Sequence, residues 1–183
     1  DGKERIEESE IAKAYQMMEN HELVGKAPFL YERLRINESP VLVGGTDFEE
    51  IRKVCPYWQI TGAFPEKGKK EILLGAELAE KYQAKAGSSV VLETGESAKE
   101  EIFTVSGIIR TGGKEEQFAY TDLSVLQGFT GQEGLISMAQ ISIVASSQEL
   151  EMLDQKMQKE HLSIHPQIVK QIAASEQTVL GKL

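Results

Sequence analysis

The sequence predicts an α+β fold in which helices pack on a mixed sheet and a β-rich subdomain is inserted into the middle of the chain. Three observations predict this class. Segments with apolar residues at helical spacing lie near both ends, alternating segments lie mostly between them, and glycine, proline and polar turn residues separate the two kinds. We therefore expect residues 1–62 and 135–183 to form one discontinuous α/β subdomain and residues 63–134 to form the β-rich insertion.

The first third of the chain predicts a helix and a pair of strands. Apolar side chains recur at helical spacing through a charged segment, which indicates an amphipathic helix over residues 4–20 (Ile6, Ile11, Ala14, Tyr15 and Met18). Gly25 and Pro28 are expected to end this pattern. Residues 29–36 and 41–43 then form two strands, joined by a tight turn at polar and proline residues (Asn37, Ser39 and Pro40).

Short helices and strands alternate in the next segment. The run from Thr46 to Glu49 has the capping-box pattern, a hydroxyl followed three residues later by a carboxylate, so a helix is expected from there to Val54. An alternating stretch follows from Trp58 to Phe64. Residues 71–74 predict a short apolar strand, and residues 76–82, which are rich in strong helix formers, predict a helix.

From Gly87 onward the apolar residues alternate, which favours a strand–loop–strand meander over helices in the rest of the insertion. In the last third, residues 139–145 alternate as a strand. A second capping box, from Ser146 to Glu149, starts a helix with an apolar stripe (Leu150, Leu153 and Met157). An extended piece at residues 162–166 and a closing helix at residues 167–180 complete the prediction.

The composition is that of an acidic globular protein. Twenty Lys and Arg against 29 Asp and Glu give a formal charge of −9, whereas a nucleic-acid surface needs clustered basic residues. The basic cluster Lys67-Gly68-Lys69-Lys70 lies between Glu66 and Glu71 and is typical of a solvated turn. No apolar run approaches the ~20 residues that span a bilayer. We expect no nucleic-acid partner.

No catalytic, cofactor-binding or metal-binding residues are predicted. His161 and His165 lie in a segment with an extended pattern, so their spacing does not bring them onto one helix face, and His21 stands alone. Cys55, as a single cysteine, forms no internal disulfide and is better explained as a buried structural thiol than as a reactive or metal-binding one. The glycine–lysine segments lack the strand–loop–helix spacing of a phosphate loop.

Five short motifs follow one another between residues 41 and 129: a strand leading into a Gly-x-Asp turn, a glycine step, a strand–glycine–helix unit, a Gly-x-x-Val strand and a Phe-x-Val-x-Gly-Ile strand. In this chain they are Val43-Gly44-Gly45-Thr46-Asp47-Phe48, Thr61-Gly62-Ala63-Phe64-Pro65, Glu71-Ile72-Leu73-Leu74-Gly75-Ala76-Glu77-Leu78-Ala79, Ala86-Gly87-Ser88-Ser89-Val90 and Ile102-Phe103-Thr104-Val105-Ser106-Gly107-Ile108-Ile109. This order resembles the extracytoplasmic domain of MacB-like ABC transporter permeases, the FtsX-like permease family. The chain departs from the family pattern at Ala63, where arginine is frequent, and at Cys55-Pro56.

The resemblance implies a porter-like fold and a non-catalytic domain between two membrane helices, at the extracytoplasmic face of a bacterial cell membrane. It implies three kinds of partner: a second copy of the permease, an ABC ATPase domain or subunit, and an extracytoplasmic adaptor or cargo. The terminal helices, at residues 4–20 and 167–180, would act as levers that pass movement of the membrane helices to the domain. The residues expected to couple these helices to the body are Ile6, Ile11, Met18, Ile172, Val179 and Leu180.

Two other functions remain open from the sequence. One is an extracytoplasmic ligand- or metal-binding module, with Cys55, His21 or acidic loops as ligands. The other is an enzyme of unrecognised type, which no motif in the sequence supports. Binding of a metal that depends on Cys55 would favour the first of these.

Overall fold

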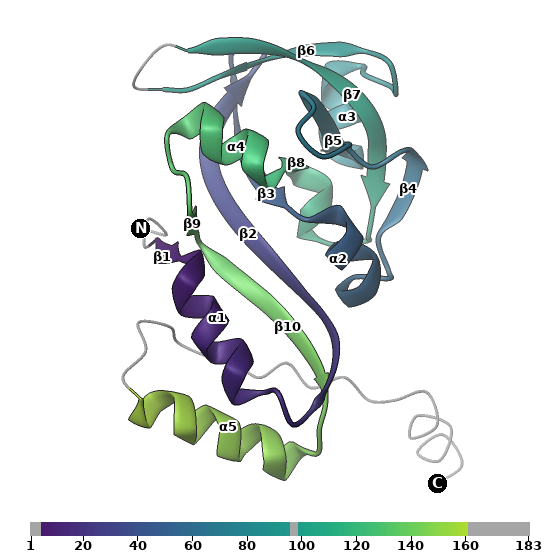
Figure 1. The fold of residues 1–183 in the computed structure, drawn as a ribbon. Coiled ribbons are helices and arrows are strands. Elements are labelled where there is room, and N and C mark those ends of the chain that lie inside the picture. Colours follow the sequence, from purple (N-terminus) through teal and green to yellow (C-terminus); the bar gives the residue numbers. More distant parts are fainter. Residues whose placement is uncertain (1–4, 96–98, 161–183) are drawn as a thin grey trace, which may run out of the picture.

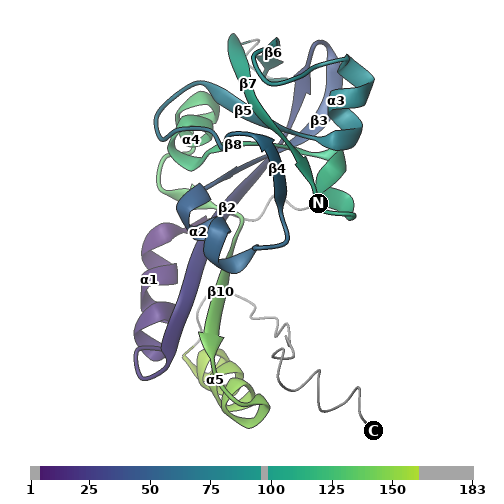
Figure 2. The same cartoon turned by 90° about the vertical axis from the view of Figure 1, so that its right-hand side faces the viewer.

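The computed structural model describes residues 5–95 and 99–160. Figures 1 and 2 show an upper part built of short strands and helices and a lower part in which α1, α5 and two long strands lie together. The helices are α1 (Glu8–Met17), α2 (Phe48–Val54), α3 (Ala76–Tyr82), α4 (Leu123–Thr130), α5 (Ser147–Lys159) and the 3₁₀ turn η1 (Lys114–Gln117). The strands are β1 (Ile6–Glu7), β2 (Glu22–Ile36), β3 (Ser39–Thr46), β4 (Gln59–Gly62), β5 (Glu71–Gly75), β6 (Ser89–Glu93), β7 (Glu100–Arg110), β8 (Ala119–Asp122), β9 (Leu135–Ile136) and β10 (Met138–Val144).

The predicted α+β class is confirmed: helices pack on a mixed eight-stranded sheet of order β10-β2-β3-β8-β5-β7-β4, and β1 and β9 form a separate two-stranded sheet. Strand β6 lies outside this linear order because it pairs with both β2 and β7. No helix in the described part of the chain has the length and apolar character needed to cross a membrane.

Six strands form a closed ring, which we call the barrel: β2, β3, β8, β5, β7 and β6. The β6–β2 seam that closes it joins Arg35 to Glu93 and Ile36 to Leu92. The larger core cluster fills the ring with aliphatic side chains of these strands and with Phe103 and Phe129. Closure leaves the barrel strands few free edges, which protects them from pairing with other chains.

The predicted strand pair at residues 29–36 and 41–43 is confirmed as the β2–β3 hairpin, but β2 is longer than expected. Gly25 and Pro28, expected to break the pattern, lie inside β2. The carbonyl of Phe29 points toward the β10 side, where it accepts from Ser137 N at 2.7 Å. Successive residues of a strand direct their backbone groups to alternate sides, so the backbone nitrogen and carbonyl of Pro28 point toward the end of β3. There no ladder bond is lost, because Thr46 Oγ1 donates to the Pro28 carbonyl at 2.7 Å.

Two predicted helix starts change. The first helix starts at Glu8 rather than at residue 4, because Ile6 and Glu7 pair with β9. The cap of α2 is Asp47, whose side chain accepts from Glu49 N at 3.0 Å, while the hydroxyl predicted to cap it serves β2 instead. The second capping box is confirmed at Ser146, and α3 has the predicted bounds. The extended piece at residues 162–166 and the closing helix at residues 167–180 lie outside the described residues.

Helix α4 and the turn η1 were not predicted, since the insertion was expected to be a strand–loop–strand meander from Gly87 onward. The apolar side chains of α4 do recur at helical spacing and are buried in the barrel (Leu123, Leu126 and Phe129). Its other residues include Val125, Gly128 and Thr130, which are poor helix formers. The helix is therefore stabilised by burial of its apolar face rather than by the helix propensity of its residues.

The division into a porter-like subdomain (residues 1–62 and 135–183) and an insertion (residues 63–134) stays a prediction. Strands β5, β7 and β8 come from the insertion, whereas β2 and β3 come from the flanking segment. All five are hydrogen-bonded within one sheet.

Candidate functional site

The start of the described chain is fastened to the barrel by a polar network, which we call the N-terminal anchor (Arg5, Glu32 and Gln132). Arg5 Nε donates to Gln132 Oε1 at 2.8 Å, and Arg5 Nη2 donates to the Tyr31 carbonyl at 3.0 Å and pairs with the Glu32 carboxylate. Gln132 Nε2 also donates to that carboxylate. The Arg5 and Glu32 side chains are only 16% and 20% exposed, so water screens the ion pair weakly.

Backbone pairing and apolar packing extend the anchor along the chain. Ile6 pairs with Ile136 and Glu7 with Leu135, and Glu8 N donates to the Gly134 carbonyl at 2.9 Å. Gln127 Nε2, on α4, donates to the Leu135 carbonyl at 2.9 Å. The segment from residue 5 to residue 8 is therefore held by side-chain bonds, ladder bonds and the neighbouring helix.

Two of the predicted coupling residues pack on the barrel core. Ile11 is buried in the larger core cluster, and Ile6 packs against the same cluster. Met18 follows the last turn of α1, is partly exposed and belongs to neither core cluster. Ile172, Val179 and Leu180 lie outside the described residues. Sequence reasoning missed Arg5 and its partners, because contacts between polar residues more than 25 positions apart leave no local pattern.

The residues considered for metal binding do not meet. His21 Nδ1 lies 3.3 Å from Glu149 Oε2, an ion pair when the histidine is protonated, at the contact between the α1 turn and α5. Cys55 is buried at the end of α2 with its Sγ 3.8 Å from Gln140 Oε1, and burial raises the pKa of its thiol. Across residues 5–95 and 99–160 no three His, Cys, Asp or Glu side chains form a group that could hold a metal ion.

An aromatic layer lies between α2 and the sheet. The Trp58 and Tyr120 rings are 4.7 Å apart, and the Phe29 and Tyr31 rings stack at 5.6 Å. Burial raises the pKa values of Tyr31 and Tyr120, whose hydroxyls are hydrogen-bonded to each other. The layer belongs to the second core cluster.

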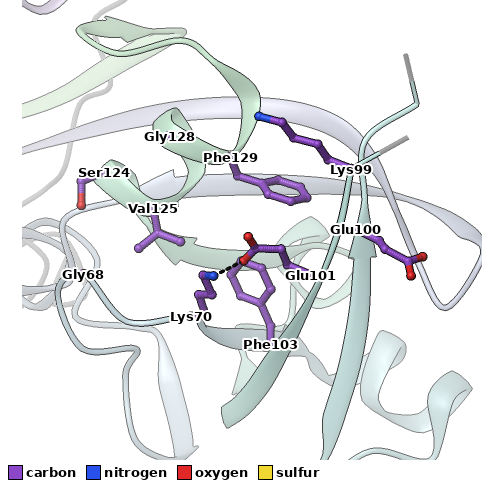
Figure 3. A pocket seen from close by; sticks show the side chains of 10 residues that line it. All are labelled: Gly68, Lys70, Lys99, Glu100, Glu101, Phe103, Ser124, Val125, Gly128 and Phe129. Carbon is purple, nitrogen blue, oxygen red and sulfur yellow. Dashed lines mark ion pairs between the residues drawn. The ribbon is translucent and has the colours of Figure 1, made fainter. Parts of the chain in front are cut away.

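A pocket of about 540 Å³ opens at the mouth of the barrel, between the start of β7, the turn before β5 and α4. Figure 3 shows its apolar floor, where Phe103 and Phe129 meet edge to face with ring centroids 6.1 Å apart. Lys70 and Glu101 pair across one side. Lys99 reaches over Phe129 from the rim, whereas the Glu100 carboxylate points away.

The two walls of the pocket are held at a fixed separation by Asp122, which is 3% exposed. Its Oδ2 accepts from Gly68 N, in the turn before β5, at 3.2 Å, and from Ser124 Oγ, in the first turn of α4. Asp122 therefore ties the turn before β5 to the start of α4 at the pocket. A volume of this size suits one large apolar side chain together with a stretch of backbone.

No protein-family model matches the sequence. No curated protein matches it either. Solved structures do match. The extracellular domain of the noncanonic ABC-type transporter YknZ from Gram-positive bacteria is 11% identical, with a TM-score of 0.63 over 88% of this chain and 87% of that chain. The periplasmic region of MacB from Actinobacillus actinomycetemcomitans is 12% identical, with a TM-score of 0.60 over 85% of this chain and 76% of that chain.

The likeness extends over most of both chains rather than over one motif. At 11–12% identity it concerns the fold. The expectation that arose from five short motifs is thereby confirmed at the level of architecture: this chain has the fold of the MacB-like extracytoplasmic domains of ABC transporter permeases.

Proposed function

We propose that this chain is the non-catalytic extracytoplasmic domain of an ABC transporter permease and that it passes ATP-driven movement of membrane helices to an adaptor or cargo outside the membrane. The fold it shares with the YknZ and MacB domains supports the location and the class of protein. The observation that carries the coupling role is the N-terminal anchor, in which Arg5, Glu32 and Gln132 tie the start of the chain to the barrel.

To transmit movement of the membrane helices, the contacts between the start of the chain and the barrel must stay intact under force. Residues 5–8 are bound to the barrel by an ion pair, by ladder bonds to β9 and by the packing of Ile6. Strand β2 then runs from the lower part of the molecule into the barrel (Figures 1 and 2). A displacement of the segment before Arg5 would move the barrel as one body, because each of these contacts would have to break for the segment to move alone.

The proposal includes the partners that such a permease requires. A second copy of the permease would face this domain across a two-fold axis, and an ABC ATPase domain or subunit would lie on the other side of the membrane. The 183-residue chain itself would hydrolyse no ATP. Met18, Ile172, Val179 and Leu180 stay candidates for contacts between the domain and its membrane helices.

The test uses the full-length permease, reconstituted with its ATPase in lipid nanodiscs. A spin label is placed by Glu77→Cys on the exposed side of α3, while Cys55 is buried with a raised thiol pKa and stays unlabelled. The distance between the labels of the two copies is measured without nucleotide and with ATP under non-hydrolysing conditions. We expect the distance to change between the two states.

Replacing Arg5 by alanine tests the anchor in the same assay. The variant should keep ATP hydrolysis and show a smaller nucleotide-dependent distance change, because one of the three kinds of contact that hold residues 5–8 in place is lost. Lys13→Ala is the matched control, since Lys13 is an exposed cation on α1. An active ATPase with the same distance distribution in both nucleotide states would refute the proposal.

A further inference from the structure

Strand β7 has an open edge beside the mouth pocket. On one side β6 pairs with Glu100–Thr104, and on the other side β5 pairs with β7 only from Thr104 onward. The chain before β5 turns away, since Lys69 N donates to the Glu66 carbonyl at 3.2 Å. Within residues 5–95 and 99–160, no strand pairs with Glu100–Phe103 on the β5 side.

The hydrogen-bonding groups on that edge can be assigned from their neighbours. Val105 N donates to Ser88 on the β6 side at 2.7 Å, and Thr104 N donates to Lys70 on the β5 side at 3.0 Å. Successive residues of a strand direct their backbone groups to alternate sides. The N–H and C=O of Ile102 and of Glu100 therefore point toward the open side, where they lie spaced as in a sheet ladder.

The side chains along this edge divide between two faces. Phe103 points to the floor of the pocket, whereas Ile102, on the opposite face, is 66% exposed. An extended peptide laid along the edge would place alternate side chains into the pocket and next to Ile102. The open edge thus supplies hydrogen bonds, and the pocket supplies a binding place for one apolar side chain.

The charge at the rim favours an acidic partner. Lys70 and Glu101 neutralise each other, and the Glu100 carboxylate points away from the pocket. Lys99 is the remaining charge over the floor, and no residue of the described ranges forms an ion pair with it.

We infer that the open edge of β7 and the mouth pocket bind an extended segment of a partner protein by strand addition, with an apolar side chain over Phe103 and Phe129 and an acidic side chain at Lys99. An isolated lipid or small apolar molecule would fill the floor but leave the Ile102 backbone groups unpaired. If the proposed function holds, this partner is the adaptor or cargo outside the membrane. The binding test is read without transport, so the two proposals can fail separately.

The test follows amide signals of the 183-residue chain by NMR while a blocked heptapeptide is added in which one leucine and one aspartate lie two positions apart, so that both side chains point to the pocket face. Before addition, the Ile102 amide should exchange with solvent much faster than the Phe103 amide, which pairs with β6. On addition, signals of Glu100–Phe103 and of Gly128 should shift, and exchange at Ile102 should slow. We expect a dissociation constant of about 0.1–1 mM, as is reasonable for a short edge with one anchor.

Three substitutions separate the components of the site. In Gly128→Gln the new side chain extends from α4 into the pocket, where a Cβ meets nothing within 4 Å. This variant should weaken binding at least about 10-fold, and it should keep α4 intact because glutamine is a better helix former than glycine. Ile102→Pro removes the N–H on the open side, with Ile102→Thr as the control for the changed side chain, and should weaken binding about 3- to 10-fold. Lys99→Ala should weaken it about 2- to 5-fold.

Each substitution has a matched control. Ile102→Thr keeps the N–H and Lys85→Ala removes an exposed lysine elsewhere, so both should bind as the unchanged chain does. A peptide with lysine in place of aspartate should bind more weakly. Absence of shifts at Glu100–Phe103 with up to about 5 mM peptide, a fast-exchanging Phe103 amide, or equal binding by Ile102→Pro would each overturn the inference. Shifts at the floor with decanoate that exceed those with the peptide would also overturn it, in favour of a lipid.

Discussion

Replacing Gly75 by alanine should destabilise the protein, because backbone atoms occupy the space of the new methyl group. Gly75 is the last residue of β5 and directly precedes α3, and its N–H donates to the Phe118 carbonyl at 2.8 Å. A Cβ built there would lie 2.3 Å from the Glu116 carbonyl oxygen and 2.6 Å from that of Glu115. Its φ of −59° and ψ of 148° suit alanine, so the whole penalty is steric.

The size of the effect follows from this overlap. Overpacking costs typically about 1–3 kcal/mol, and here the obstacle is the η1 backbone, which places the cost near 3 kcal/mol. The smaller freedom of alanine in the unfolded chain offsets about 0.5–1 kcal/mol of this. A net loss of about 2–2.5 kcal/mol corresponds to a fall in Tm of about 4–10 °C for a chain of this length.

Gly128→Ala is the matched control, since it makes the same chemical change in α4 where nothing lies within 4 Å of the new Cβ. It should raise the free energy of unfolding by about 0.5–1 kcal/mol, as alanine is the better helix former. Urea and thermal unfolding followed by circular dichroism measure both variants. If the two variants melt within about 2 °C of each other, the steric reasoning is wrong.

The remaining predictions concern charge and burial. Arg5→Ala should lower the free energy of unfolding by about 1–2 kcal/mol, because it leaves the Glu32 carboxylate half-buried without its cation. The urea midpoint measures this loss. The double variant Arg5→Ala with Glu32→Gln should recover part of it. Burial raises the pKa of Tyr15 to about 12, against about 10 in the unfolded chain, and raises that of Tyr120 as well. Between about pH 10 and 12 the folded state therefore keeps tyrosine protons that the unfolded state loses. The free energy of unfolding should be constant just below pH 10 and should fall from about pH 10 to 12. An unfolding midpoint that stays constant from pH 10 to 12 would contradict this prediction. The Cys55 thiol, buried and with a raised pKa, should react with a disulfide reagent at pH 8 at least about 100-fold more slowly in the folded chain than in urea, and equal rates would show that α2 opens freely.

Local signals in the sequence account for much of this fold. Helix α3 has the predicted bounds, the capping box at Ser146 starts α5, and the turn of the β2–β3 hairpin lies where polar residues predicted it. That turn places Asn37 and Glu38 at φ values of 48° and 70°, a left-handed pair that matches the twist of the strands. Each of these features depends on residues only a few positions apart.

The features that the sequence did not predict depend on distant partners. The Arg5 network joins positions 5, 32 and 132, and α4 exists because its apolar face enters the barrel. The mouth pocket arises where β7 continues beyond the start of β5, and only the register of the sheet determines that offset. No motif of a single sequence records such a register.

The order in which the barrel strands occur along the chain has a consequence for synthesis. Strand β3 ends at Thr46, yet its second neighbour, β8, begins at Ala119. A ribosome that adds roughly 5–20 residues per second needs about 4–15 s to supply the missing strand. During that time one edge of β3, with Val41 and Val43 on it, lies open to any other extended chain. The edge of β3 that β8 covers in the finished barrel is therefore exposed to association for the time that synthesis of the intervening segment takes.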